Sequence, residues 1–402
     1  MRQTIANILR WQAKKYISKN NLKIAVITGS VGKTSTTQAI ATVLEMSFRV
    51  RKTLQNYNTD IGVPCSIFSK QIPSSIKNPA SWTWLILNNQ MQIYRKAPFE
   101  ILVLELGTDN PGDIFKFSWL RPDIAVVTAV APEHMEFFKT IDNVAKEELS
   151  VANYSDKTII NKNMVDSKYL KYVDNDQIFN YSRGDISLIG LETDELSIVG
   201  EHSIDAISAA IGVGRALGMQ VSALIDGAKM IKPLKGRMNK LQGINNSILI
   251  DDTYNASPMA VTAALDYLYS VKAPQRIALL GNMNELGEYS EEAHRKLGRY
   301  CNPKKIDVII TLGPDVTNYT AIEARKKGCK VFSTNNPYEA AEIIKSVLIK
   351  DAVILFKGSQ NGVYAEETTK LLLNNSEDEK YLVRQSAVWL KKKQVSFMGL
   401  QK

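Results

Sequence analysis

Short apolar runs rich in valine and isoleucine recur along this 402-residue chain, separated by longer segments that can form helices. This alternation is typical of parallel sheets, because each parallel connection needs a crossover, usually a helix. Several runs are apolar at nearly every position, as expected of strands buried on both faces. We therefore predict an α/β fold with parallel-rich sheets, whose strands include residues 23–27, 101–106, 124–128, 247–250, 276–280, 308–312 and 352–356.

The length of the chain predicts more than one domain, because single hydrophobic cores stop growing at roughly 250–300 residues. A boundary is expected near Pro233, where the segment IKPLKGRMNK places proline, glycine and charge between two apolar regions. We predict a first domain over residues 1–232 that begins with a short helix, a second domain over 233–375, and a helical tail over 376–402.

Both ends of the chain predict helices. Residues 1–20 include Arg10, Lys14 and Lys15, so they lack the uninterrupted apolar core of a signal peptide or a membrane span. We interpret them as an amphipathic helix that packs on the core, with membrane contact as the alternative. Its apolar stripe would be Ile5, Ile8, Leu9, Tyr16 and Ile17. In the tail, a solvated helix face is expected for Lys391 to Lys393, and a shared face for Leu382, Ser386, Trp389 and Leu390.

The formal net charge is +9, from 50 basic and 41 acidic residues that are scattered along the chain. Because no basic motif is interleaved with aromatic residues, this charge favours small anionic substrates over nucleic acid as the partner. The cysteines Cys65, Cys301 and Cys329 lack metal-type or disulfide-type spacing, which favours a reducing, cytoplasmic location. A monomer is the simplest expectation for the oligomeric state.

The most specific motif is KIAVITGSVGKTSTTQAI, an apolar strand followed by a glycine-rich turn and a helix. Gly29 and Gly32 would let backbone N–H groups point inward, and the start of the helix adds the positive end of its dipole. Lys33 can reach terminal phosphates, and the Thr34 hydroxyl can hold Mg²⁺. Only part of the GxxxxGK[ST] pattern is present, because Ile27 occupies the first glycine position. A bare GK[ST] often only opens a helix, but the flanking strand and helix favour nucleotide binding.

Two polar residues stand at the ends of predicted strands. Glu105 interrupts the apolar strand in ILVLELGTDNPGDI, which is costly unless a cation satisfies the carboxylate. A bound nucleotide phosphate needs such a cation, with hard oxygen ligands at strand ends. His134 follows another buried strand in DIAVVTAVAPEHMEFF. A lone histidine is more often structural than catalytic, so spacing alone leaves its role open.

A series of segments, in this order, resembles the Mur ligase family: ITGSVGKTS, NYNTDIGVP, LELGTDNPGDI, RPDIAVVTAVAPEHMEFF, GEHSIDAISAAIGVG, KGRMN, IDDTYNASP, LLGNMNELGEYSEEAH and FKGSQNGVYAEE. They run from residue 24 to residue 367, which is nearly the whole chain. They are most similar to the branch of the family that joins D-alanyl-D-alanine to a UDP-N-acetylmuramoyl-tripeptide in peptidoglycan precursor synthesis.

The resemblance implies a P-loop central domain and a Rossmann-like α/β C-terminal domain. ATP would be bound at Gly29, Ser30, Val31, Gly32, Lys33, Thr34 and Ser35, with further contacts from His202, Arg237, Asp252, Tyr254 and Asn255. Mg²⁺ would be held by Thr34, Glu105 and His134. Asp252 could instead cap a turn, and Asn255 could simply suit the bend before Pro258. Substrate contacts are expected at Asn56, Asn58, Thr59, Asp60, Asn282, Glu285, Lys357 and Ser359.

The implied reaction is attack of a substrate carboxylate on the γ-phosphate of ATP, followed by attack of an amine on the acyl phosphate. The expected partners are therefore a nucleotide-sugar peptide and a dipeptide. Positioning and charge neutralisation would be the work of the protein, which makes Lys33, Glu105, His134 and Arg237 the expected catalytic residues. Two domains that both contact ATP would close at a hinge near residues 233–236.

The sequence departs from the family at several positions. The residues before the phosphate loop are too few for the separate domain that grips the UDP end of the substrate, so we expect that domain to be missing. Asn282 stands where aspartate is usual, and Gln360 where arginine is common, which leaves the amine acceptor open.

The carbamylated lysine of the family has no clear counterpart. Its position falls on Glu148, with Lys146 as the alternative register. At about 100° per residue these two lie roughly 200° apart around a helix, so they cannot both face a metal. We favour Glu148, which would add a catalytic carboxylate; the alternative is that Glu147 and Glu148 are two solvent-facing charges.

Two other functions compete with the cell-wall ligase. One is a related ligase acting on another carboxylate, of the folylpolyglutamate or cyanophycin type; the segments NYNTDIGVP and DDTYNASP favour the cell-wall branch. The other is a nucleotide-binding scaffold without catalysis, against which the intact Lys33, Glu105, His134 and Arg237 argue. We therefore expect an ATP-dependent, ADP-forming ligase.

Overall fold

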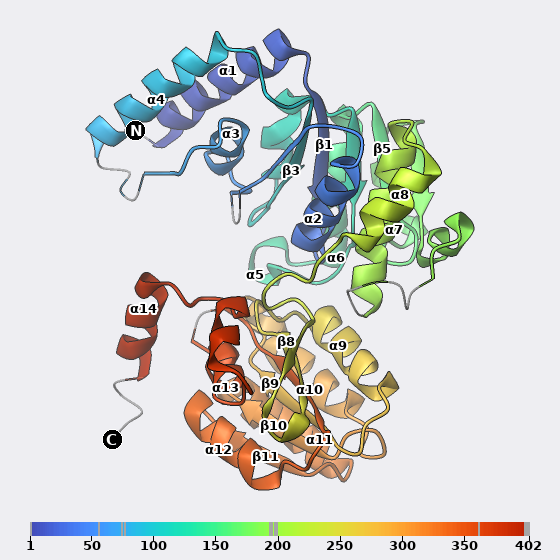
Figure 1. Cartoon of the computed structure of the whole chain (residues 1–402), viewed down its shortest axis with the longest axis vertical. Helices are drawn as coiled ribbons and strands as arrows, with labels where there is room; N and C mark the ends of the chain where they lie inside the picture. The colour runs from blue at the N-terminus through green and yellow to red at the C-terminus, as the bar shows by residue number, and fades with distance from the viewer. Residues whose placement is uncertain are drawn as a thin grey trace. The chain divides into compact units, whose positions relative to one another are not determined.

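The computed structural model of the chain describes residues 2–54, 57–73, 75, 78–192, 196, 200–360 and 362–397. The chain forms two compact units (Figure 1). The first comprises Met1–Ala131, Phe137–Ser197 and His202–Ile231, and the second Pro132–Glu136, Ile198–Glu201 and Lys232–Lys402. Each unit contains a six-stranded sheet, so the predicted α/β fold is confirmed.

The sheet of the first unit is entirely parallel, in the order β2-β3-β1-β4-β5-β6. Its strands are β1 (Lys23–Thr28), β2 (Val50–Lys52), β3 (Ile101–Glu105), β4 (Ile124–Val127), β5 (Lys157–Asn161) and β6 (Ile178–Tyr181). The predicted strands at 23–27, 101–106 and 124–128 are confirmed as β1, β3 and β4. These three occupy the middle of the sheet, and their side chains form the centre of the core.

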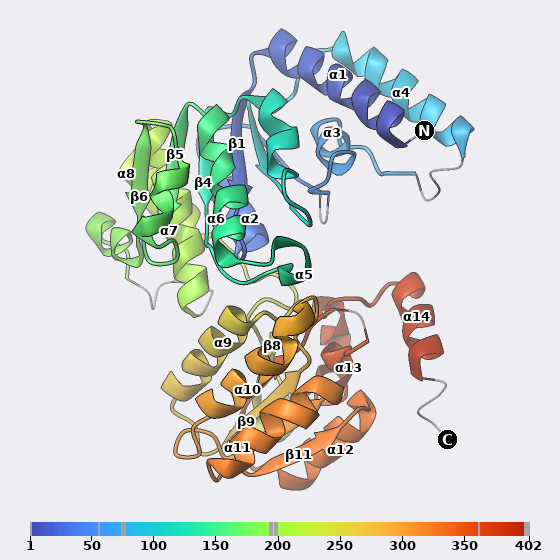
Figure 2. The ribbon, with the colours of Figure 1, turned by 180° about the vertical axis from the view of Figure 1, so that it is seen from behind.

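Helices cover both faces of this sheet. Those of the first part of the chain are α1 (Arg2–Asn20), α2 (Lys33–Leu44), α3 (Gly62–Ile67), α4 (Pro79–Ile93), α5 (Met135–Phe138), α6 (Ile141–Leu149), α7 (Glu201–Ala216) and α8 (Val221–Lys229). Helices α2, α7 and α8 lie on one face and α6 on the other (Figures 1 and 2). The N-terminal helix is confirmed as α1, which buries Ile5, Leu9 and Tyr16. Ile8 was wrongly assigned to the buried stripe, because it is 36% exposed.

The sheet of the second unit has the order β11-β10-β9-β12-β8-β7, in which only the edge strand β7 is antiparallel. Its strands are β7 (Asn239–Gln242), β8 (Ile248–Asp252), β9 (Arg276–Gly281), β10 (Val308–Leu312), β11 (Val331–Thr334) and β12 (Val353–Lys357). Its helices are α9 (Pro258–Ser270), α10 (Ser290–Tyr300), α11 (Ala321–Lys326), α12 (Pro337–Val347) and α13 (Ala365–Lys370). The four strands predicted in this region are confirmed as β8, β9, β10 and β12.

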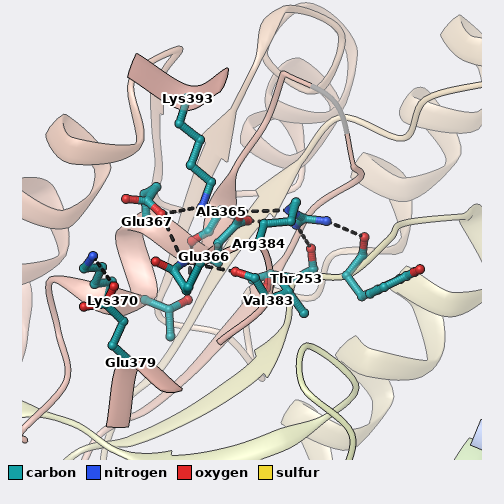
Figure 3. A network of polar contacts seen from close by, with 12 residues as sticks. Thr253, Ala365, Glu366, Glu367, Lys370, Glu379, Val383, Arg384 and Lys393 are labelled. Atoms are coloured by element: carbon teal, nitrogen blue, oxygen red, sulfur yellow. Dashed lines mark hydrogen bonds and ion pairs between the residues drawn. The ribbon is translucent and has the colours of Figure 1, made fainter. Parts of the chain in front are cut away.

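The tail ends in helix α14 (Ala387–Phe397), but its buried face differs from the predicted one. Leu382 and Ser386 precede the helix, and its buried residues are Lys393 and Phe397. Lys393 is not solvated: its Nζ lies 2.5 Å from Glu367 Oε1 and 2.9 Å from Glu366 Oε1 (Figure 3). The prediction that Lys393 is solvated is therefore wrong, because two carboxylates of α13 bind it.

None of the helices within the described residues combines the length and the apolar character needed to cross a membrane.

Candidate active site

The phosphate loop joins β1 to α2 and has the backbone shape of a phosphate cradle. Gly29 has a φ of 126° and Gly32 a φ of 88°. A Cβ at Gly29 would lie 2.2 Å from the hydroxyl oxygen of Thr128, so only glycine permits this approach. Among the described side chains, none caps the start of α2, so the N–H groups of its first turn can bind an anion. Lys33 folds over this loop and donates a hydrogen bond to the Gly29 carbonyl.

The segment after β4 fastens the phosphate loop in place. The Thr128 hydroxyl donates to the Val31 carbonyl at 2.6 Å. The Ser30 N–H donates to the Ala129 carbonyl at 2.9 Å, and the Ala131 N–H donates to Ser30 Oγ at 3.0 Å. The cradle is therefore preformed. Thr128 was not among the predicted site residues, although a polar residue at the end of the apolar run DIAVVT was a usable signal.

Glu148 supports the loop from helix α6. Its side chain is fully buried, and its Oε2 accepts hydrogen bonds from the Gly29 N–H, at 2.8 Å, and from the Thr28 hydroxyl. Its Oε1 is also buried and has no hydrogen-bond partner among the described residues. The carboxylate therefore lies directly behind the first glycine of the phosphate loop.

The two residues before Glu148 differ in burial. Glu147 is buried and accepts from the N–H groups of Gly112 at 2.6 Å and Ile114 at 2.7 Å. Its pKa is raised by burial, against the lowering effect of those two hydrogen bonds. Lys146 is exposed. The alternative that both glutamates face solvent is therefore wrong.

Glu105 lies at the same edge of the sheet as the phosphate loop. It is the last residue of β3 and pairs in register with Ile27 of β1. Its carboxylate is buried, and Oε1 accepts a hydrogen bond from Asn58 Nδ2 at 3.2 Å. The Gly107 N–H donates to the Asn58 carbonyl at 2.9 Å. The structure thus brings Asn58, expected to contact substrate, against Glu105, expected to bind metal.

The residues of this edge fit a hard cation such as Mg²⁺, which prefers oxygen ligands and keeps several waters. The Glu105 carboxylate and the Thr34 hydroxyl offer such oxygen atoms, and Glu148 Oε1 is a buried carboxylate oxygen without a hydrogen-bond partner among the described residues. No group of three His, Cys, Asp or Glu side chains within the described part of the chain could hold a metal alone. His134 belongs by its contacts to the second unit, where its Nδ1 lies 3.7 Å from Glu285 Oε2.

Other residues expected near substrate or nucleotide make local structural contacts or cannot be placed. Asp60 forms an ion pair with Arg2 of α1 at 2.7 Å. Thr59 Oγ1 accepts from the Gly62 N–H, at the start of α3, at 3.2 Å. Asn56 lies outside the described residues. His202 is in α7, but its side chain also lies outside the described part.

A small pocket opens beside the phosphate loop within the first unit, lined by Val31, Gly32, Thr36, Thr128, Asn161, Met164, Tyr181 and Asp205. Arg183 holds Asp205 with two hydrogen bonds of 3.0 and 3.1 Å. The Tyr181 hydroxyl is buried and has no hydrogen-bond partner among the described residues. None of these polar groups was predicted; Asp205 lies in the segment GEHSIDA, from which only His202 was selected.

In the second unit, a buried ion pair joins the ends of two neighbouring strands. Lys357 of β12 pairs in register with Asp252 of β8, and its Nζ lies 2.6 Å from Asp252 Oδ2. Burial lowers the pKa of Lys357, and the carboxylate of Asp252 acts in the opposite direction. Asp251 beside it is fully buried, and burial raises its pKa to about 6. The side chain expected to bind nucleotide and the one expected to bind substrate therefore bind each other.

The segment after β8 is held by the C-terminal tail. The Arg237 guanidinium lies 4.2 Å from the centre of the Tyr254 ring. Arg384 donates to the carbonyls of Thr253 at 2.5 Å and Tyr254 at 3.0 Å. The same guanidinium binds both carboxylate oxygens of Glu366, at 2.7 and 2.8 Å (Figure 3). Arg384 was not identified from the sequence, because its partners lie far from it along the chain.

Asn255, Asn282 and Ser359 form a connected group at the same edge. The Ser359 hydroxyl donates to Asn255 Oδ1 at 2.9 Å, and the Ser359 N–H donates to the Asn282 carbonyl at 3.2 Å. Asn282 Oδ1 accepts from the Val316 N–H at 3.0 Å. These contacts fix the ends of β9 and β12 and the segment after β8 relative to one another.

His294 of α10 supports the loop after β9. It is fully buried, its Nε2 accepts from the Met283 N–H at 3.1 Å, and its Nδ1 lies 2.7 Å from the Ser290 carbonyl. Nδ1 must therefore carry the proton, which makes the ring neutral. Burial lowers the pKa of His294.

Two family models match successive regions of the chain. The Mur ligase middle domain matches residues 27–214, and the glutamate ligase domain of Mur ligases matches residues 236–360. The chain belongs to the Mur ligase family. It is 27% identical over 389 residues to the UDP-N-acetylmuramoyl-tripeptide--D-alanyl-D-alanine ligase of Bacillus subtilis (strain 168), an alignment that covers 91% of this chain and 79% of that protein.

Solved structures of Mur ligases share the fold. MurF from Thermotoga maritima in complex with ADP has a TM-score of 0.72 and 23% identity, over 93% of this chain and 84% of that one. MurF from Acinetobacter baumannii has a TM-score of 0.73 and 21% identity, over 92% and 80%. Helices α1 and α14, and the Glu366 and Glu367 carboxylates that bind Lys393 of α14, lie outside both matched Mur ligase regions.

Proposed function

We propose that this protein is an ATP-dependent, ADP-forming ligase that adds D-alanyl-D-alanine to a UDP-N-acetylmuramoyl-tripeptide in peptidoglycan precursor synthesis. The observation that carries the proposal is the preformed phosphate loop with Glu105 at the same edge of the sheet. The ligase named from Bacillus subtilis, which aligns with most of this chain, supports the choice of substrates.

The proposed reaction has two steps. A substrate carboxylate oxygen attacks the γ-phosphorus of ATP, the bond to the bridging oxygen breaks, and an acyl phosphate and ADP form. The amine nitrogen then attacks the acyl carbon and loses a proton, and phosphate leaves with the C–O bonding pair. Because charge accumulates on phosphate oxygens in the first step, fixed positive groups should account for most of the acceleration.

The first unit supplies those groups. The N–H groups at the start of α2 and the Lys33 ammonium would bind the phosphates, once Lys33 leaves the Gly29 carbonyl. Thr34 and Glu105 would hold Mg²⁺, which when bound neutralises phosphate charge. Glu148 would keep the first loop glycine in position through its N–H.

The second unit supplies a separate group of polar side chains. We assign nucleotide contacts to Arg237, Asp252, Tyr254 and Asn255, as the resemblance to Mur ligases implies. Asn58 in the first unit, and Asn282, Glu285, Lys357 and Ser359 in the second, remain proposed substrate contacts. Because Lys357 is buried against Asp252, its contribution would be to fix that carboxylate rather than to carry free charge. We further propose a monomer in the cytoplasm, where ATP is available.

The test is ADP release by the full chain with UDP-N-acetylmuramoyl-tripeptide and D-alanyl-D-alanine, each omitted in turn. We expect sustained release only when both are present, because the acyl phosphate must be trapped by the amine. Rapid release with ATP alone would indicate an ATPase instead. Activity with glutamate or folate substrates, and none with the muramoyl peptide, would favour a ligase acting on another carboxylate.

Lys33→Ala should lower turnover by roughly 10²-fold or more, because the lysine contributes charge to the transition state. The melting temperature should stay near that of the parent, since Lys33 is not part of the core. Lys162→Ala, at an exposed position of the same unit, is the matched control. Parental turnover by a folded Lys33→Ala protein would remove the assignment of the loop.

A further inference from the structure

Helix α4 exposes an apolar face. Trp84, Leu87 and Met91 are 62%, 59% and 57% exposed, and at 100° per residue they fall within an arc of about 60°. Tyr94, which directly follows the helix, is 68% exposed. The segment Pro79–Ile93 contains no charged residue at all. A surface helix normally turns charged and polar side chains outward, so this face indicates contact with an apolar phase.

Helix α1 extends the apolar face. Gln12 Nε2 donates to the Ile86 carbonyl at 2.8 Å, so the Gln12 side of α1 faces α4. Figures 1 and 2 show α1 and α4 side by side. Ile8 is about 40° from Gln12 around α1, and Trp11, next to Gln12 in sequence, is 51% exposed. We call the resulting surface the hairpin patch, which consists of Ile8, Trp11, Trp84, Leu87, Met91 and Tyr94.

The hairpin patch is surrounded by positive charge. Residues 1–44 and 61–99 contain no aspartate or glutamate, and α1 contains five basic residues. Lys15 Nζ lies 4.7 Å from the centre of the Trp11 ring, Lys19 Nζ 5.0 Å from that of Tyr94, and Lys70 Nζ 5.7 Å from that of Trp84. Aromatic rings flanked by lysines are typical of surfaces at the lipid headgroup level, where the rings enter the interface and the ammonium groups meet phosphates.

We propose that the hairpin patch docks this protein on an anionic phospholipid surface without crossing it. The apolar side chains would enter the boundary between headgroups and acyl chains, while the surrounding cations are attracted by the negative surface potential. A second copy of the chain fits less well, because a two-fold contact would bring the same basic, acid-free surfaces together. The inference goes beyond the proposed reaction and does not depend on it.

The test is cosedimentation of the full chain with vesicles of phosphatidylcholine and phosphatidylglycerol, compared with vesicles of phosphatidylcholine alone. We expect binding to the anionic vesicles that weakens as salt is raised. Lys15→Glu should lower the partition coefficient by roughly tenfold or more, because each basic residue near such a surface adds to the attraction. The double variant Leu87→Gln/Met91→Gln should lower it as well, by removing apolar side chains from the interface.

Two control variants separate the patch from general surface effects. Leu188→Gln changes a side chain that is 74% exposed elsewhere in the first unit, and Lys162→Glu reverses one exposed charge there. Both should bind vesicles like the parent, and all variants should keep its melting temperature. Absence of parental binding, equal binding to neutral vesicles at every salt concentration, or equal loss in the controls would overturn the proposal. A dimer in light scattering that Leu87→Gln/Met91→Gln dissociates would assign the patch to a second copy instead.

Discussion

The buried ion pair between Arg384 and Glu366 should control both the stability of the second unit and its segment after β8. Arg384→Met keeps the apolar stem of the side chain but removes every N–H donor. Glu366, fully buried, would keep only Lys393 as a cationic partner, and the carbonyls of Thr253 and Tyr254 would each lose a hydrogen bond. The change therefore leaves buried polar groups unsatisfied rather than simply removing a surface contact.

The size of the effect follows from that burial. Removing one partner of a buried pair typically costs about 3–5 kcal/mol, and the Lys393 contact that remains argues for the lower end, about 3 kcal/mol. For a domain of this size each kcal/mol lowers the melting temperature by roughly 2–4 °C, so a fall of roughly 6–12 °C is expected in the transition of the second unit. Because Thr253 and Tyr254 belong to the proposed nucleotide segment, KM for ATP should rise more than kcat falls.

Thermal unfolding and steady-state ADP release measure the two effects. The control is Lys370→Met, which breaks a pair with Glu379 whose side chains are 31% and 34% exposed. Such a pair is worth about 0–1 kcal/mol, so its loss should hardly move the transition. Arg384→Lys should recover part of the stability but not the paired geometry. The prediction is wrong if Arg384→Met has the same melting temperature as Lys370→Met, or if it leaves KM for ATP unchanged.

Three further predictions concern single side chains. Gly29→Ala should abolish ADP release because its Cβ would meet Thr128. Gly112→Ala is the control: Gly112 also has a positive φ but nothing within 4 Å of an added Cβ, so the change should lower the free energy of unfolding by about 1–2 kcal/mol and keep activity. Equal losses of activity would contradict this prediction. Glu148→Ala should reduce activity sharply, whereas Lys146→Ala should keep nearly the activity of the parent. Added bicarbonate should not change the activity of the parent. Stimulation by bicarbonate would instead favour Lys146 as the counterpart of the carbamylated lysine. Burial lowers the pKa of His294, so this side chain is protonated more readily in the unfolded chain and stability should fall as pH drops below about 6.5. The melting temperature of the parent should exceed that of His294→Gln by less at pH 5.5 than at pH 7.5. A constant difference would contradict the neutral ring.

The central strands could be predicted from the sequence because they are buried on both faces. Five strands were not predicted: the edge strands β2, β6, β7 and β11, and β5, which is mostly buried but has only two apolar residues in its sequence KTIIN. β7 is an antiparallel edge strand with no buried position, and β2, also at an edge, is a three-residue strand, VRK, with half-buried side chains. Edge strands meet solvent on one side, so their composition resembles that of loops.

The site residues divide in the same way. The phosphate loop and Glu105 were recognisable because local motifs place them at strand ends. The residues that hold them, such as Thr128 and Arg384, depend on partners that only the fold brings near. The burial of Lys393 was also unpredictable, since a lysine run is solvated unless a distant pair of carboxylates reaches it.

The order of strands in the first sheet has a consequence for synthesis on the ribosome. β1 lies between β3 and β4, and Thr128, which closes the phosphate loop against β4, bonds to Thr28 across a separation of 100 residues. At about 5–20 residues per second, the loop emerges some 5–20 s before the strand that shapes it. A nascent chain that ends before residue 128 should therefore be unable to retain nucleotide, however complete its glycine-rich motif.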